Sequence, residues 1–197
     1  MASISRMQEA RDATLEEWRK VQRPGVGQFL DWLVTTDYFT APCSTQYHLA
    51  CAGGLALHSL NVLSLLRSKN DFYELNFPDK TLIVCGLGHD VAKVGFYSLE
   101  PRWRKDDRGK WVEKQVYVVK DTLPLGHGER SVIVLQNHML LTPDEQLSIR
   151  WHMGGFDPGV HFNYPNGYPF QEACKIPLVT LLQTSDLEAT RILELEN

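Results

Sequence analysis

The chain has 197 residues, 43% of them hydrophobic and 22% charged, which is enough for one folded domain with a sizeable core. Its formal net charge is -4, so it carries no global basic field that would attract nucleic acid or anionic membranes. A nucleic-acid partner would therefore have to be met by a local patch.

The cysteines and the apolar runs indicate the cellular compartment. The four cysteines show no CxxC spacing, which favours free thiols in a reducing compartment over a disulfide framework. The first twenty residues mix charged and apolar positions and do not form a signal peptide. No stretch approaches the roughly 18 to 20 apolar residues that span a bilayer. We therefore expect a cytoplasmic protein with no membrane partner.

Apolar residues at helical spacing predict two helices near the start of the chain. The first runs from about Met7 to Val21 and is ended by Pro24-Gly25. A second, short helix covers Gln28 to Thr35, and the segment from Thr36 to about His48 has turn and loop character.

Two longer apolar segments follow. Gly53-Gly54 opens a helix that continues to Leu66 and carries His58 in its middle. Another helix runs from Asp79, a plausible N-cap, to His89. Its almost wholly apolar run ends at His89-Asp90, so an interior segment delivers an imidazole and a carboxylate side by side.

The pattern then changes to that of a β-hairpin, about residues 96–119. Phe96 to Leu99 and Trp111 to Val119 are rich in β-formers, and the charged segment from Lys105 to Lys110 lies between them. The hairpin is locally basic. It can guide a nucleotide or a single strand, or it can simply be a solvated turn.

Helices return in the last third of the chain. We expect them over Gly128 to Gln136, over Pro143 to Trp151 and over Gln171 to Leu195, where Pro177 either kinks the helix or marks its true first turn. Between them, Met153 to Phe170 reads as a long loop. With no internal repeat or linker, residues 1–197 form a single, mainly α domain, with N-terminal helices over 1–37 and a core over about 38–192.

Histidines and aspartates recur in the middles or at the ends of these helices. Imidazole and carboxylate groups together suit divalent ions, and a helical bundle builds a metal site from one or two such residues per helix. Taken singly, each has an ordinary structural role as a core histidine, a cap or a turn residue. The set is His58, His89, Asp90, His127, His152 and Asp186.

These residues lie in motifs that resemble the HD-domain superfamily of metal-dependent phosphohydrolases. The matching pieces are Gly54-Leu55-Ala56-Leu57-His58-Ser59-Leu60-Asn61-Val62, Gly88-His89-Asp90-Val91-Ala92-Lys93 and Thr184-Ser185-Asp186. Leu125-Gly126-His127-Gly128 and Trp151-His152-Met153-Gly154 resemble the extra histidine motifs of two-metal members. The hairpin and Tyr38-Phe39-Thr40-Ala41-Pro42 look like the branch that contains HD-type 3′–5′ exoribonucleases. The resemblance covers about residues 38 to 192.

The resemblance implies an HD-type helical bundle with an inserted β-hairpin and a ligand set for one or two divalent ions (Mn, Mg, Fe, Zn, Co or Ni). His58, His89, Asp90 and Asp186 would hold one ion, and Asp90 would bridge to a second ion served by His127 and His152. Lys93 would hold a substrate phosphate as a point charge, unless it is a solvated surface lysine.

One position departs from the pattern of the two-metal relatives. Many of them have a His-His pair where this chain has Trp151-His152. The loss of one imidazole weakens the case for a tightly held second ion, so the number of ions turns on Trp151.

The reaction implied is hydrolysis of a phosphate ester or diester of a nucleotide, cyclic nucleotide or nucleic-acid end by metal-activated water. Asp90, Lys93, His127 and His152 are the candidate catalytic residues, and either histidine, if it is not a ligand, could protonate the leaving alkoxide. The alternatives are an HD-fold di-iron oxygenase and a metal-stabilised nucleotide sensor that does not cleave. The sequence leaves the oligomeric state open, including a homo-oligomer.

Aromatic side chains of the hairpin and of the loop can stack a base or pack these segments onto the bundle. They are Trp103, Trp111, Phe156, Phe162, Tyr164, Tyr168 and Phe170.

Overall fold

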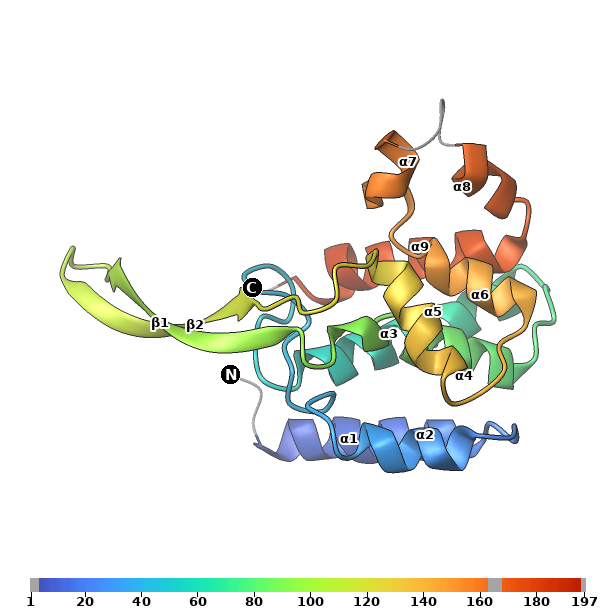
Figure 1. Cartoon of the computed structure of the whole chain (residues 1–197), viewed down its shortest axis with the longest axis horizontal. Helices are drawn as coiled ribbons and strands as arrows, with labels where there is room; N and C mark the ends of the chain where they lie inside the picture. Colours follow the sequence, from blue (N-terminus) through green and yellow to red (C-terminus); the bar gives the residue numbers. More distant parts are fainter. Residues whose placement is uncertain (1–3, 163–167, 196–197) are drawn as a thin grey trace.

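The computed structural model of the protein describes residues 4–162 and 168–195. It is mainly helical, with one two-stranded antiparallel ribbon that extends outward from an end of the bundle (Figure 1). None of the helices within these ranges has both the length and the apolar content needed to cross a membrane. The elements are α1 (Ile4–Arg19), α2 (Val26–Leu33), α3 (Gly54–Phe72), α4 (Asp79–Gly88), η1 (Val91–Lys93), β1 (Tyr97–Lys105), β2 (Trp111–Val119), α5 (His127–Gln136), α6 (Pro143–Arg150), η2 (Gly154–Phe156), α7 (Pro158–Phe162), α8 (Tyr168–Ala173), α9 (Pro177–Glu188) and the π-helical turn η4 (Ala189–Leu193).

Helix α4 lies at the centre of the bundle. All its residues from Thr81 to Gly88 are buried, which explains why the run is apolar on every side and not only along one stripe. It packs against α3, and α3 packs in turn against α9. A Cβ on Gly86 would lie 2.9 Å from Cα of Leu63, so only glycine permits this close approach of α3 and α4. The approach also brings His58 and His89 together.

The N-terminal helices belong to the same core. Trp18 of α1 and Phe29 of α2 are buried, with ring centroids 4.8 Å apart, and Leu33 is fully buried beside them. Figure 1 shows α1 and α2 along one side of the bundle. These helices therefore pack on their own chain.

The ribbon confirms the predicted hairpin and extends its first strand. β1 pairs with β2 from Tyr97↔Val119 at the base to Lys105↔Trp111 near the tip. At the base, the hydroxyl of Tyr97 donates to the carbonyl of Cys43 at 3.1 Å. The ribbon is thus joined to the loop before α3, although most of its length stands clear of the bundle (Figure 1).

Three local predictions were wrong. Asp79 does not cap α4, because Pro78, with extended backbone, is the N-cap, and the Asp79 carboxylate instead accepts from Arg67 at 2.7 Å. The segment predicted as a loop over residues 153–170 contains η2, α7 and part of α8, and its residues 163–167 lie outside the described ranges.

The third concerns the last helix, which does not begin at Gln171. Helix α8 ends at Ala173, and Ile176 has extended backbone. Pro177 then occupies the first turn of α9, where its missing N–H costs no hydrogen bond. Of the two roles predicted for Pro177, a kink or the first turn of the last helix, the second is therefore confirmed. All four cysteines are free, and Cys43 and Cys85 are buried.

A buried ion pair ties the segment after α1 to α6. The guanidinium of Arg23 donates to both carboxylate oxygens of Glu145 at 2.8 Å, and the side chain of Glu145 is fully buried. Thr81 donates to the same carboxylate at 3.0 Å, and Thr142 completes a capping box with Glu145 at the start of α6. Burial opposes the charge, but Arg23 and Thr142 hold the pKa of Glu145 below its usual value.

We predict that Arg23→Ala lowers the free energy of unfolding by about 3 to 5 kcal/mol near pH 7, because it leaves a buried carboxylate without its cation. The pair stabilises the fold above the unfolded-state pKa of glutamate, about 4.3, and this stabilisation is lost as the pH falls through the lower pKa of the folded state. The difference between wild type and variant therefore shrinks below about pH 4. Unfolding of both proteins by urea at several pH values measures this difference in the free energy of unfolding.

Arg102→Ala is the matched control, since the Arg102–Glu100 pair on the ribbon is exposed. It should cost less than about 1 kcal/mol. An equal loss in both variants would contradict the stabilising role of the buried pair.

Candidate metal centre

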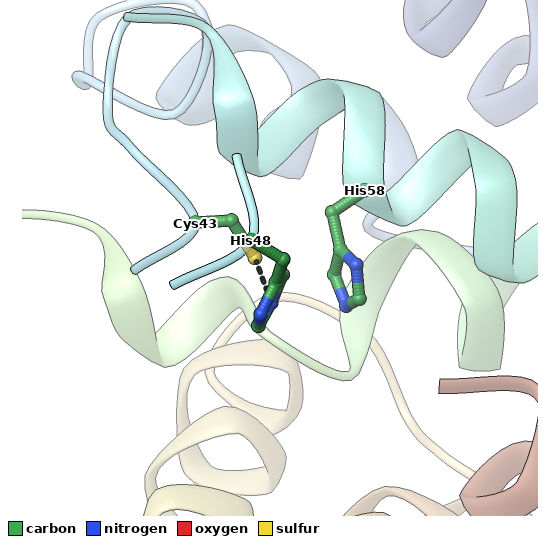
Figure 2. A group of neighbouring side chains, drawn as sticks. All are labelled: Cys43, His48 and His58. Atoms are coloured by element: carbon green, nitrogen blue, oxygen red, sulfur yellow. Dashed lines mark hydrogen bonds between the residues drawn. The ribbon is translucent and has the colours of Figure 1, made fainter. Parts of the chain in front are cut away.

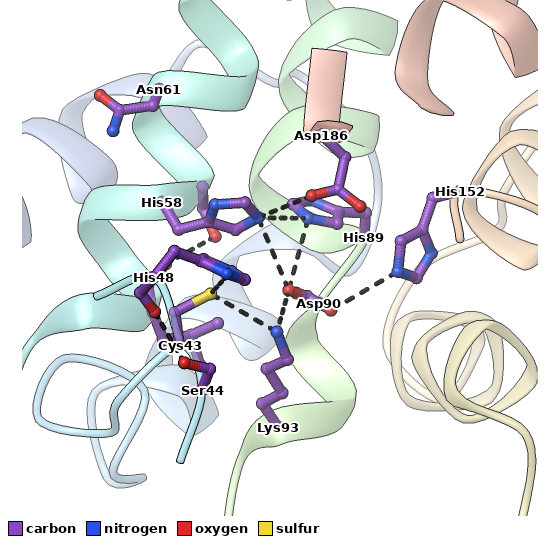
Figure 3. Close-up of polar contacts among 12 residues, drawn as sticks. Cys43, Ser44, His48, His58, Asn61, His89, Asp90, Lys93, His152 and Asp186 are labelled. Carbon is purple, nitrogen blue, oxygen red and sulfur yellow. Dashed lines mark hydrogen bonds and ion pairs between the residues drawn. The ribbon is translucent and has the colours of Figure 1, made fainter. Parts of the chain in front are cut away.

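Five segments bring the predicted ligands to one place. His58 lies in α3, His89-Asp90 directly follows α4, and His127 is the first residue of α5. His152 follows α6, and Asp186 lies near the end of α9. Figure 3 shows Asp90 between His152 on one side and the pair His58 and His89 on the other. Every residue proposed as a ligand from the sequence is part of this cluster.

A close approach of two helices sets the position of His127. A Cβ on Gly128 would lie 2.1 Å from the carbonyl oxygen of Arg150, so α5 begins in contact with the end of α6. This contact places His127 near His152, with ring centroids 5.6 Å apart.

One group of ligand atoms surrounds Nε2 of His58. This nitrogen lies 3.1 Å from Oδ1 of Asp186 and 3.3 Å from Nε2 of His89. Oδ2 of Asp90 is 3.8 Å from His58 Nε2 and 3.5 Å from His89 Nε2. Two imidazole nitrogens and two carboxylates thus face a common point, and His58, His89 and Asp90 are buried.

Hydrogen bonds on the outer side of the His89 and His152 rings fix which nitrogen of each faces inward. Nδ1 of His89 donates to the carbonyl of Gly86 at 2.9 Å, and Nδ1 of His152 donates to the carbonyl of Ile149 at 2.7 Å. A neutral ring with its proton on Nδ1 presents the lone pair of Nε2, and ligating histidines in proteins are held in this way. Burial lowers the pKa of His89 to about 4, so its ring is neutral at pH 7.

The inward-facing nitrogens fit a cation. Nε2 of His152 is buried and has no hydrogen-bond partner among the described residues. Burial disfavours charge on His58, yet the carboxylates of Asp186 and Glu194 raise its pKa well above the usual value. A divalent ion would replace that proton, since it offers positive charge to the same carboxylates. Buried imidazoles and carboxylates of this kind can hold a metal ion.

The second group of ligand atoms gathers around the other oxygen of Asp90. Oδ1 accepts from Nε2 of His127 at 2.6 Å and lies 3.5 Å from Nε2 of His152. Burial would raise the pKa of Asp90, but Lys93, His89 and His127 hold it well below the usual value. Asp90 is therefore an anion whose two oxygens face two different groups of ligands.

Lys93 is not a solvated surface lysine. The η1 turn places it three residues after Asp90, where its buried Nζ donates to Oδ2 of Asp90 at 2.6 Å and to Cys43 Sγ at 3.4 Å. Burial disfavours its charge, but Asp90 raises its pKa well above the usual value. Lys93 also lines a cavity beside the cluster.

Sequence reasoning missed Glu194, which orients His58. Both carboxylate oxygens of Glu194 lie 3.0 Å from Nδ1 of His58, and one accepts from Asn61 at 2.9 Å. Glu194 comes eight residues after Asp186, about two helical turns, so helical spacing would have placed both on one face. The π-helical turn Ala189–Leu193 widens that interval.

Cys43 and His48 were also missed. Sγ of Cys43 lies 3.2 Å from Nε2 of His48, and both side chains lie beside His58 (Figure 2). Burial raises the pKa of Cys43 to about 11 and lowers that of His48 to about 4, so both groups are neutral at pH 7. A cysteine and a histidine five residues apart in a loop give no periodic signal that would have marked them.

The side chain of Trp151 lies outside the second group of ligand atoms. Its ring packs with Ala173 and Val179 in a separate apolar cluster, 5.7 Å from the ring of Phe170 and under the guanidinium of Arg150 at 4.0 Å. His152 lines the cavity, whereas the Trp151 side chain is directed elsewhere. The second group therefore has no imidazole from position 151, and the dependence of the number of ions on this position stays a prediction.

A cavity of about 720 Å³ opens onto the cluster. Asp90, Lys93, His127, His152 and Asp186 line one side of it. Its other walls come from the loop Cys43–His48, from the base of the ribbon, from Phe156 and from the C-terminal turn. A cavity of this volume accommodates a ligand of nucleotide size.

Comparison with known proteins adds no relative. No family model matches the chain, and neither a curated protein nor a solved structure does.

We predict that His89→Ala removes at least half of the bound metal from protein purified in the presence of Mn²⁺, because the mutation deletes an inward-facing nitrogen of the first group. Elemental analysis of the desalted protein measures the content. His138→Ala is the control, since His138 stacks on Trp32 at 5.1 Å, outside the cluster. Unchanged metal in His89→Ala would refute the assignment.

We predict opposite outcomes for two neighbouring residues. His152→Ala should lower the molar ratio of metal to protein, whereas Trp151→Phe should leave it unchanged, because only His152 faces Asp90. Calorimetric titration with Mn²⁺ measures the ratio. A loss in Trp151→Phe equal to that in His152→Ala would contradict the division of roles.

Proposed function

We propose that the protein is a metal-dependent phosphohydrolase with an HD-type helical bundle. It would hydrolyse a phosphate ester of a nucleotide, a cyclic nucleotide or a nucleic-acid end. The order His58, His89-Asp90, Asp186 supports the HD-type assignment, and the free thiols fit the reducing cytoplasm that we propose as its location.

One observation carries the proposal. The two oxygens of Asp90 face separate groups of imidazole nitrogens, at 3.5 and 3.8 Å on one side and at 2.6 and 3.5 Å on the other. A carboxylate in this position can bridge two divalent ions, with His58, His89 and Asp186 around one and His127 and His152 around the other. Such ions supply hydroxide from water near neutral pH and offset the charge on phosphoryl oxygens.

The side chains at the cavity wall divide the remaining tasks. Lys93 presents a buried ammonium to the cavity and can hold a phosphoryl oxygen as a point charge. His127 is one-quarter exposed, whereas His152 is buried. Where His127 does not hold the second ion, its Nε2 is therefore the better placed to pass a proton to the leaving alkoxide.

We predict that Asp90→Asn lowers hydrolysis of bis-p-nitrophenyl phosphate in the presence of Mn²⁺ by at least about 100-fold, because an amide cannot supply two anionic oxygens. Release of p-nitrophenol measures the rate. Asp31→Asn, on the exposed side of α2, is the control and should keep full activity.

Activity that survives in Asp90→Asn would refute the mechanism. Wild-type protein that binds metal but hydrolyses neither this ester nor any dNTP, cyclic dinucleotide or short RNA would refute the proposed function. That second result would leave a nucleotide sensor or an oxygenase.

A further inference from the structure

The ribbon β1–β2 has one face that is continuous with the wall of the cavity. Side chains of a strand alternate between its two faces, so Tyr97, Leu99 and Trp103 share a face with their partners on β2. At the base of that face, Tyr97 and Val119 line the cavity. Near the tip, Nζ of Lys105 lies 5.6 Å from the ring centroid of Trp111, which places these two on the same side.

This face carries exposed apolar side chains together with the polar side chains of Lys105, Glu113 and Gln115. Trp103 is 64% exposed and Trp111 is 59% exposed, and Leu99 and Val119 are each 55% exposed. The register pairs Trp103 with Glu113 and Trp111 with Lys105, so the two indoles are diagonal neighbours on adjacent strands. Figure 1 shows the ribbon standing clear of the helices, so the bundle does not cover these rings. The possibility that Trp103 and Trp111 pack the hairpin onto the bundle is thereby excluded.

The ribbon carries a net positive charge, whereas the rest of the chain is net negative. Between Tyr97 and Val119 there are six lysines and arginines and four acidic residues, a formal net charge of +2 in a chain of net charge -4. Arg102, Arg104 and Lys114 extend from the opposite face, and all three are exposed. A two-stranded ribbon twists strongly, and long basic side chains can extend past its edges toward the aromatic face.

We infer that the ribbon binds single-stranded nucleic acid and leads its end into the cavity. Unpaired bases stack on Trp103 and Trp111, and the phosphates follow the basic edge toward Lys93. Exposed aromatic rings beside basic side chains are the features by which proteins bind single strands without reading their sequence. This inference rests on the proposed function, and it selects the nucleic-acid end among the proposed substrates.

The length of the ribbon sets a length for the substrate. Trp103 lies six residues from Tyr97, about 20 Å at about 3.3 Å per residue. At a stacked rise of about 3.4 Å per nucleotide, a strand with its end in the cavity needs about six nucleotides to reach the indoles. A dinucleotide is too short to touch them.

The test compares the wild type with the double variant Trp103→Ala, Trp111→Ala. We expect the variant to bind a 12-nucleotide single strand at least about tenfold more weakly, measured by fluorescence anisotropy with both RNA and DNA. Its hydrolysis of bis-p-nitrophenyl phosphate and of a dinucleotide should be unchanged. The double variant Trp103→Phe, Trp111→Phe keeps stacking rings and should retain most of the affinity. Phe72→Ala removes an exposed aromatic ring of α3 and is the control.

Equal binding of the 12-mer by the wild type and the alanine variant would overturn the inference. So would a wild type whose self-association, measured by sedimentation, is lost in the variant without any change in nucleic-acid binding. That outcome would make the ribbon a contact between copies of this chain. Because hydrolysis of bis-p-nitrophenyl phosphate is measured in parallel, failure of the inference is distinguishable from failure of the proposed function.

Discussion

The site depends on one buried carboxylate whose two oxygens face opposite directions. Asp90 is anionic in the interior because Lys93 and His127 donate to its two oxygens at 2.6 Å. An isolated carboxylate there would be protonated or would destabilise the fold, since burial of an unpaired charge is costly. Asp90 is therefore charged only because Lys93 and the imidazoles surround it, and this charge is what would attract a divalent ion to the site.

The surrounding fold holds the imidazoles in the orientation that Asp90 requires. The backbone carbonyls of Gly86 and Ile149 and the carboxylate of Glu194 each accept from the Nδ1 of one histidine. Each bond directs an Nε2 inward and fixes its tautomer. The bare backbone of Gly86 also lets α3 approach α4, so the packing of the core and the geometry of the ligands have a common origin. A change in core packing near Gly86 would accordingly disturb the site.

The sequence predicted the inner part of the site well, because the signals there are local. An apolar run that ends at His89-Asp90 can belong only to an interior helix, and the remaining ligands lie in similar helical contexts. Residues that act across the fold were harder to predict. Glu194 reaches His58 from a distance of 136 residues in the chain, and Cys43 and His48 lie in a loop without periodicity. The direction of Trp151 depends on the packing of α8 against α6, which no local pattern encodes.

The central claim is that Asp90 is shared between two ions, and anomalous X-ray diffraction from crystals soaked in Mn²⁺ tests it most directly. Our account predicts two anomalous peaks, one beside each oxygen of Asp90, each within coordination distance of at least one histidine Nε2. A single peak at one oxygen, or no peak near Asp90, would contradict it.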